Sequence, residues 1–351
     1  MTLQLDEITK LAVKLIRFRT VSGRHREAET CFRFIKDYLR NRKIVFRHYV
    51  SNSFHSIVIS QGRELHKRYA LLGHIDVVPA PACMFKPVIK NGLLYGRGAI
   101  DMKSQIAVML YLFKHNLPDN TALWLTSDEE LGGENGVKEI LRQGHGADFF
   151  IAPDGGDNFK LITREKGLMW IKITEKGKSG HASRPWEGEN AIEKLITKLN
   201  SLSKFFPSDN KDKWVNTMSI GVIKGGSVAN KIPEKAEAIV DIRFTTNSEQ
   251  ILKELSRITD FKLIKLGEVF ETDESNKDVK RLAATMESVL GKKIGCCYEH
   301  GASDARHLAE KGIPCALFNP EGGGAHTKEE YVRLKSLEPS YRILKQYLTG
   351  G

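Results

Sequence analysis

The sequence predicts an α/β protein of two domains: a mostly parallel sheet with helices on both faces, and an inserted α+β domain. Its 351 residues exceed the size at which single hydrophobic cores usually stop growing. Strand-like and helix-like segments alternate over residues 1–166, which favours a parallel sheet covered by helices. Over residues 167–273 the order becomes β-α-β-β-α-β, typical of a ferredoxin-like sandwich. Residues 274–351 then return to the first domain.

Hydrophobic periodicity predicts the helices and strands of the first domain. Helical spacing marks residues 5–18 and 28–41, and a strand follows at 57–59. Later segments alternate regularly: strands at 69–72, 122–125 and 149–152, and helices at 103–115 and 137–142. Polar residues of interest stand where these strands stop. In open α/β sheets, ligands bind at the carboxyl ends of the strands.

The inserted domain has a different sequence pattern from the first domain, with strands that alternate between apolar and polar residues. We expect strands at 168–174, 218–223, 236–244 and 261–266, and helices at 190–202 and 248–258. After the insertion, a helix at 279–290 and a strand at 316–318 rejoin the first domain. The sequence shows no internal repeat and no low-complexity tract.

Composition and charge exclude several classes of protein. No run of about 18 uncharged apolar residues is present, which argues against a membrane span, and the first 19 residues read as an amphipathic helix and not as a signal peptide. The net charge is +11, but the surplus is dispersed, with +5 in residues 160–272 and +6 elsewhere. We therefore expect no nucleic-acid partner, and a positive field that attracts small anionic substrates. Five cysteines without regular spacing indicate reduced thiols and a cytoplasmic protein; the vicinal Cys296 and Cys297 could form a redox or soft-metal site, a weaker hypothesis.

Two adjacent carboxylates, Glu129 and Glu130, end the apolar run that begins at Leu123. Carboxylates at the end of a buried strand are costly unless a cation receives them. The rest of the chain supplies matching candidates, each after an apolar or glycine-rich approach: His74, Asp101, Glu130, Asp154 and His326. Nitrogen and oxygen donors without thiolate suit Zn²⁺, and also Mn²⁺ or Co²⁺. Two ions in such a set would share a bridging carboxylate.

The segments around these residues resemble the dizinc peptidase and deacylase family that contains acetylornithine deacetylase, succinyl-diaminopimelate desuccinylase and related exopeptidases. The resemblance is carried by residues 74–76, 98–103 and 128–130 and by the late His326, and it covers nearly the whole chain. It implies that His74 and Asp154 bind one metal ion, that His326 and Glu130 bind the other, and that Asp101 bridges them. Asp76 would accept the second imidazole N–H of His74 and so fix its tautomer.

The resemblance also implies catalytic roles. Glu129 would be the general base that takes a proton from the attacking water and passes it to the leaving amine. His181, in the inserted domain, would polarise the scissile carbonyl and stabilise the oxyanion, commonly by reaching across a dimer interface. The inserted domain would thus be a lid that also forms a homodimer. Asn230, Arg243 and Ser303 match positions that contact the substrate in relatives, although Arg243 could instead pair with Asp241 or Glu237.

One departure bears on the substrate. Desuccinylases and deacetylases usually carry glutamate where this chain has Asp154, whereas aminopeptidase-like members carry aspartate. The resemblance implies a dizinc amidohydrolase that cleaves an N-acyl amino acid, with a di- or tripeptidase, which Asp154 favours, as the near alternative. A catalytically silent metal-binding scaffold and a nucleic-acid binder remain as remote alternatives.

Overall fold

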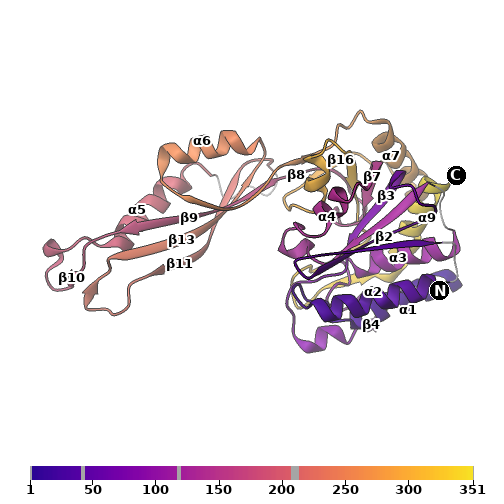
Figure 1. Ribbon diagram of the computed structural model, residues 1–351, viewed down its shortest axis with the longest axis horizontal. Helices are drawn as coiled ribbons and strands as arrows, with labels where there is room; N and C mark the ends of the chain where they lie inside the picture. Colours follow the sequence, from indigo (N-terminus) through magenta and orange to yellow (C-terminus); the bar gives the residue numbers. More distant parts are fainter. Residues whose placement is uncertain (1, 41–43, 117–119, 207–212, 351) are drawn as a thin grey trace. The chain divides into compact units, whose positions relative to one another are not determined.

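The computed structural model describes residues 2–40, 44–116, 120–206 and 213–350. The chain divides into two compact units (Figure 1). The first unit contains Met1–Arg164, Glu271–Glu299 and Ser303–Gly351, and the second contains Glu165–Phe270 and His300–Ala302. The first unit is therefore discontinuous in sequence, and each unit has its own hydrophobic core.

A nine-stranded sheet forms the centre of the first unit, in the order β1-β2-β6-β3-β7-β17-β8-β15 with β16 paired to β8. Its strands are β1 (Val45–Ser51), β2 (Phe54–Ser60), β3 (His66–His74), β6 (Thr121–Thr126), β7 (Gly146–Ala152), β8 (Leu161–Glu165), β15 (Phe270–Glu271), β16 (Cys296–Glu299) and β17 (Cys315–Leu317). The central neighbours β6, β3, β7 and β17 are parallel. The predicted mostly parallel sheet is confirmed, with antiparallel strands toward its edges.

Helices cover this sheet because their apolar faces must be buried. The helices of this unit are α1 (Leu3–Arg17), α2 (His25–Leu39), α3 (Lys103–His115), α4 (Val137–Arg142), α7 (Lys277–Leu290), α8 (Ala305–Ala309) and α9 (Leu337–Thr349). α3 packs against α1, α2, α9 and the sheet, and it is buried along nearly its whole length. Figure 1 shows α1, α2 and α3 side by side along the sheet. The predicted end of the second helix, at residue 41, lies outside the described residues.

A second, small sheet in the same unit joins two distant parts of the chain. It has the order β18-β19-β5-β4, from β4 (Val88–Lys90), β5 (Leu93–Tyr95), β18 (Gly322–Gly323) and β19 (Tyr331–Arg333). β19 pairs with β5 through Val332 and Leu94, which are both fully buried. The segment after β5 and the loop between β18 and β19 are thus held together, although more than 200 residues separate them.

The second unit contains the elements that the sequence places in the inserted domain, in the predicted β-α-β-β-α-β order. They are β9 (Gly167–Lys176), α5 (Ala191–Ser203), β11 (Thr217–Gly225), β13 (Lys235–Phe244), α6 (Ser248–Ile258) and β14 (Lys262–Gly267), with a short β10 (Gly180–His181) paired to β12 (Lys231–Ile232). The antiparallel sheet has the order β11-β13-β9-β14. α5 and α6 lie on one side of it (Figure 1) and bury Leu195, Leu199 and Leu255 against it.

Among the described residues, no helix combines the length and the apolar character that crossing a membrane requires.

Candidate metal centre

Three parallel strands deliver polar side chains to one edge of the central sheet. β3 ends at His74, which lies opposite Thr126 at the end of β6. A single 3₁₀ turn, Glu129–Leu131, follows β6, and Asp154 follows β7 by two residues. Because β6, β3 and β7 are parallel neighbours, their carboxyl ends meet at the same edge. The predicted ligands that follow these strands therefore come together.

The small sheet brings the remaining two candidates to the same place. Asp101 lies between β5 and α3, and His326 lies in the loop between β18 and β19. His326 adopts a φ of 63°, in the left-handed region that few residues other than glycine adopt. Its side chain remains 55% exposed, whereas that of His74 is only 2% exposed. The two imidazoles therefore differ sharply in their access to solvent.

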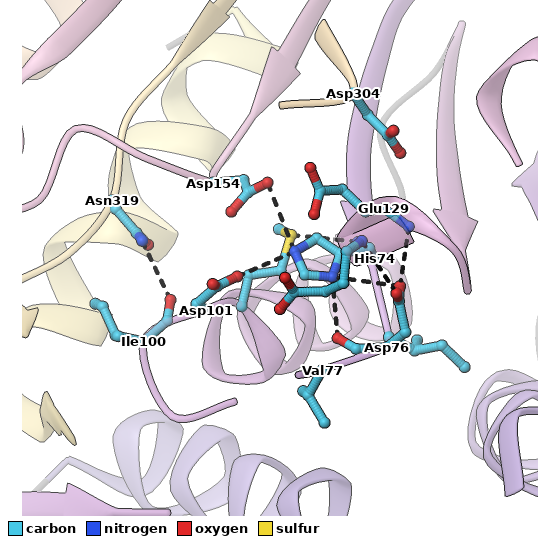
Figure 2. Close-up of polar contacts among 12 residues, drawn as sticks. His74, Asp76, Val77, Ile100, Asp101, Glu129, Asp154, Asp304 and Asn319 are labelled. Carbon is cyan, nitrogen blue, oxygen red and sulfur yellow. Dashed lines mark hydrogen bonds and ion pairs between the residues drawn. The ribbon is translucent and has the colours of Figure 1, made fainter. Parts of the chain in front are cut away.

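Five side chains form two groups that share Asp101. In one group, His74 Nε2 lies 3.1 Å from Asp101 Oδ1 and 3.6 Å from Asp154 Oδ2 (Figure 2). In the other, His326 Nε2 lies 3.0 Å from Asp101 Oδ2 and 3.2 Å from Glu130 Oε2. Within each group the donor atoms all lie within 4.8 Å of one another. Each group thus offers one imidazole and two carboxylates to a cation, with a different oxygen of Asp101 facing each imidazole.

Asp76 fixes the orientation of the His74 ring through its Nδ1 side. Its Nδ1 lies 3.0 Å from the carbonyl oxygen of Asp76 and 3.5 Å from Oδ1 of the same residue. A proton on Nδ1 therefore donates to Asp76, which leaves the Nε2 lone pair for a cation. The Asp76 carboxylate also accepts hydrogen bonds from the backbone N–H groups of Glu129 and Glu130 and from the Ser22 hydroxyl. Asp76 thus connects the two segments that carry His74 and the glutamate pair (Figure 2).

The charges of the five side chains in these two groups favour a bound cation. Burial raises the pKa of Glu130 and of Asp154, and hydrogen bonds or charge from His326 and His74 oppose that rise. For Asp101, burial acts in the same direction, but hydrogen bonds from both histidines outweigh it and hold its pKa below the ordinary value. Several carboxylates in so small a space are costly without positive charge. Imidazole nitrogens and carboxylate oxygens without thiolate fit Zn²⁺, Mn²⁺ or Co²⁺.

Glu129 stands apart from both groups. It lines a small cavity together with His74, Asp154, Ser303 and Asp304. Burial raises the pKa of its carboxyl well above the usual range; the charge of His74 opposes this rise, and Asp304, Asp154 and Glu130 reinforce it. A carboxyl group of this kind accepts and holds a proton more readily than an ordinary glutamate does. Its position and its pKa both suit general base catalysis.

Asp304 is a residue of this site that the sequence reasoning missed, although its neighbour Ser303 was among the predicted substrate contacts. It is buried, lies beside the small cavity, and accepts a hydrogen bond of 3.2 Å from the Thr126 hydroxyl. Arg306, two residues later, donates to the Gly132 carbonyl in the turn that follows the glutamate pair. A Cβ at Gly133 would lie 1.9 Å from Asp304 Oδ1, and its φ is +66°. Only glycine allows this close approach.

The other predicted residues are distributed between the units. Ser303 belongs to the first unit, where it is buried beside Glu129. His181, Asn230 and Arg243 belong to the second. His181 is exposed on β10, and its Nδ1 lies 2.8 Å from the Ser183 hydroxyl. Arg243 Nε lies 2.7 Å from Asp241 Oδ1, the pairing that the sequence left open. The roles of these residues at the metal centre stay predictions.

Cation binding is expected to release protons and to strengthen as the pH rises. Hydrogen bonds to Asp101 and Glu130 raise the pKa of His326 to about 10, so its ring is protonated at neutral pH without a cation. A cation must displace that proton. Because the folded pKa exceeds the ordinary 6.5, this protonated ring stabilises the cation-free fold fully below pH ~6.5, and the stabilisation disappears as the pH rises through ~10.

Zn²⁺ calorimetry at pH 7.5, in two buffers of different ionisation enthalpy, measures this release. We expect at least one proton to be released per chain when the site is saturated with Zn²⁺, and fewer in His326→Ala. The control is His66→Ala, since His66 is an exposed histidine that pairs with Asp148 and lies outside both groups. A heat that is the same in both buffers would contradict the interpretation.

Comparison with known proteins identifies the family. Residues 70–350 match the model of peptidase family M20/M25/M40. The chain is 31% identical over 320 residues to succinyl-diaminopimelate desuccinylase of Rickettsia felis, and the match covers 79% of this chain and 82% of that protein. Among solved structures, it resembles a tripeptidase from Staphylococcus aureus (TM-score 0.81, 19% identity, 98% and 97% of the two chains). It also resembles a metallo-carboxypeptidase of the same family from Sulfolobus solfataricus (TM-score 0.81, 15% identity, 98% of each chain). The chain therefore belongs to peptidase family M20/M25/M40 and is a metal-dependent hydrolytic enzyme.

Proposed function

We propose that this enzyme hydrolyses the amide bond of an N-acyl amino acid and that it holds two divalent cations, most naturally Zn²⁺. The observation that carries this proposal is the pair of donor groups that share Asp101, with Glu129 beside them and outside both. His74 and Asp154 would hold one ion, His326 and Glu130 the other, and Asp101 would bridge them. Similarity to a desuccinylase over most of the chain supports the acyl amino acid as substrate.

The bound cations would lower the pKa of a water molecule and polarise the scissile carbonyl. The protein itself would move the proton. Glu129, whose pKa is raised, would take it from the attacking water on a carboxylate oxygen and later deliver it to the amine nitrogen that leaves. The Asp76 carboxylate holds this glutamate in place by accepting a hydrogen bond from the Glu129 backbone N–H. Arg306 fixes the turn that follows by donating to the Gly132 carbonyl.

The remaining contacts would come from the second unit, acting as a lid, and from Ser303 of the first unit. His181 would donate from its ring to the oxyanion, and Asn230, Arg243 and Ser303 would contact the substrate, with Arg243 recognising a carboxylate through its planar fork. In His181→Ala we expect turnover at saturating substrate to fall about 10²–10³-fold, the usual cost of one oxyanion donor. Unchanged turnover would remove His181 from this role.

The second unit would also form a homodimer. β11 is an edge strand of its sheet, and Ile220 and Ile223 on it are exposed. Exposed apolar edges favour pairing with a second chain. Sedimentation equilibrium should give twice the chain mass of 39.5 kDa, and a monomer at micromolar concentration would reject this proposal.

A di- or tripeptidase is the second candidate, because Asp154 stands where desuccinylases and deacetylases usually carry glutamate. Turnover of the cation-loaded protein on a panel of N-succinyl and N-acetyl amino acids, dipeptides and tripeptides separates the two. We expect the highest kcat/KM on an N-acyl amino acid. A preference for peptides with a free amino group would replace the deacylase assignment with the peptidase one.

A further inference from the structure

The loops that carry Asp101 and His326 are connected through one buried glutamate. Glu330 is 1% exposed and lies four residues after His326. Its Oε1 accepts hydrogen bonds from the backbone N–H groups of Ile100 (3.1 Å) and Asp101 (3.3 Å). Its own carbonyl oxygen accepts from the N–H of Gly96. The backbone that presents the shared carboxylate is therefore held by a side chain from the other loop.

Arg97, which lies on the Asp101 side, contacts the loop that carries His326. It is 3% exposed, and its Nη1 donates to Glu330 Oε2 at 2.5 Å. Its Nη2 donates at 3.1 Å to the carbonyl oxygen of Thr327, the residue next to His326. One guanidinium thus contacts both the buried glutamate and the backbone beside the exposed histidine. Arginine's planar fork suits two acceptors in fixed directions, which a lysine ammonium does not reproduce.

The loop that carries His326 differs from the strand that carries His74. This loop is bounded by strands of two and three residues, the His326 backbone has a positive φ, and its side chain is more than half exposed. His74, in contrast, ends a nine-residue strand in the centre of the sheet. On the Asp101 side, Asn319 adds a hydrogen bond from its Nδ2 to the Ile100 carbonyl (Figure 2). The backbone at Ile100 and Asp101 is thus held by both Glu330 and Asn319. The backbone beside His326 is held by Arg97, which donates to the Thr327 carbonyl.

We propose that Arg97 and Glu330 are positioning residues that fix the spacing between Asp101 and His326, and that they thereby set the affinity of the cation held by Asp101, Glu130 and His326. The proposal rests on the ligand assignment made above. Partners that orient metal ligands typically contribute 10- to 100-fold to metal affinity. Arg97 acts mainly on the His326 side, and Glu330 acts on both loops.

Arg97→Lys is the most informative variant, because it keeps a positive charge beside Glu330 and so protects the fold. We expect it to bind one ion 10- to 100-fold more weakly and the other within about threefold of the wild type. Glu330→Gln should weaken the same ion at least as much. Chelator-stripped protein is titrated with Zn²⁺ against a chromogenic chelator, and with Co²⁺ followed by its visible absorption. The matched control is Arg333→Gln, which removes an exposed ion pair with Glu321 on the same hairpin.

A thermodynamic cycle with His326→Ala distinguishes positioning from general stability. If Arg97 acts through the histidine, Arg97→Lys should have little further effect on Zn²⁺ affinity once the imidazole is gone. Additive effects, or both ions bound within about threefold of wild type in Arg97→Lys, would overturn the proposal, even if Glu330→Gln failed to fold. If His326→Ala itself kept both ions at wild-type affinity, the ligand assignment would fail instead.

Discussion

Glu129→Gln is expected to reduce kcat about 10²–10⁴-fold while both cations remain bound. The range is the usual contribution of a general acid–base group. Glutamine preserves the size of the side chain and the backbone N–H that donates to Asp76, but it cannot accept a proton from the attacking water. Glu129 belongs to neither donor group, so the number of Zn²⁺ ions per chain should not change. Steady-state turnover and metal analysis of the same preparation measure the two effects.

Glu134→Gln is the matched control for this variant. Glu134 lies five residues further along the chain, and its side chain is 55% exposed, where it pairs with Lys138. The same chemical change there should leave kcat within about twofold of the wild type, since exposed ion pairs contribute little. Near-normal turnover in Glu129→Gln would remove this residue from the mechanism. Loss of an ion from Glu129→Gln would show that Glu129 is a ligand and not a base.

Asp101→Asn is expected to have the second large effect, the loss of both cations. Asp101 is the residue that the two donor groups share, with Oδ1 facing His74 and Oδ2 facing His326. An amide has one carbonyl oxygen and no charge, so it cannot bridge two ions. Affinity for each ion should fall at least ~100-fold, beyond the range for residues that only orient ligands. Turnover should fall to the background rate at limiting Zn²⁺.

Asp157→Asn provides the control, because Asp157 is a nearby carboxyl group outside both donor groups. Burial raises its pKa to about 6, and Asn319 lies within 3.4 Å of its Oδ1. We expect two ions per chain in this variant. If Asp101→Asn also retained two tightly bound ions, the carboxylate would not bridge them, and the two groups would be independent sites.

Residues at the ends of long apolar strands could be placed from sequence. β3, β6 and β7 have six to nine residues each and are largely buried, so their hydrophobic runs reveal where they stop. The polar residues that follow, such as His74 and Asp154, were therefore identifiable as neighbours at one sheet edge. The predicted bounds of α3 and α4 also agree with the structure.

The small sheet could not be predicted, because strands of two or three residues carry no periodicity. Arg97 and Glu330 were missed with it, since their importance depends on the pairing of β5 with β19. The antiparallel edge strand β1 was also missed; its side chains are mostly half-buried and give a weak pattern. α9 was missed although it carries a usable signal, with Leu337, Tyr341, Leu344 and Leu348 buried at helical spacing. Pro339 in its first turn is compatible with a helix start.

Turnover as a function of bound Zn²⁺ tests the central claim most directly. Chelator-stripped protein is reconstituted with increasing Zn²⁺, and amine release from an N-acyl amino acid that the enzyme cleaves is measured beside the metal content of each sample. We predict no turnover without Zn²⁺, and a rise that is complete at two ions per chain in the wild type. Undiminished turnover in the stripped protein, or equal turnover in Asp101→Asn, would contradict the account.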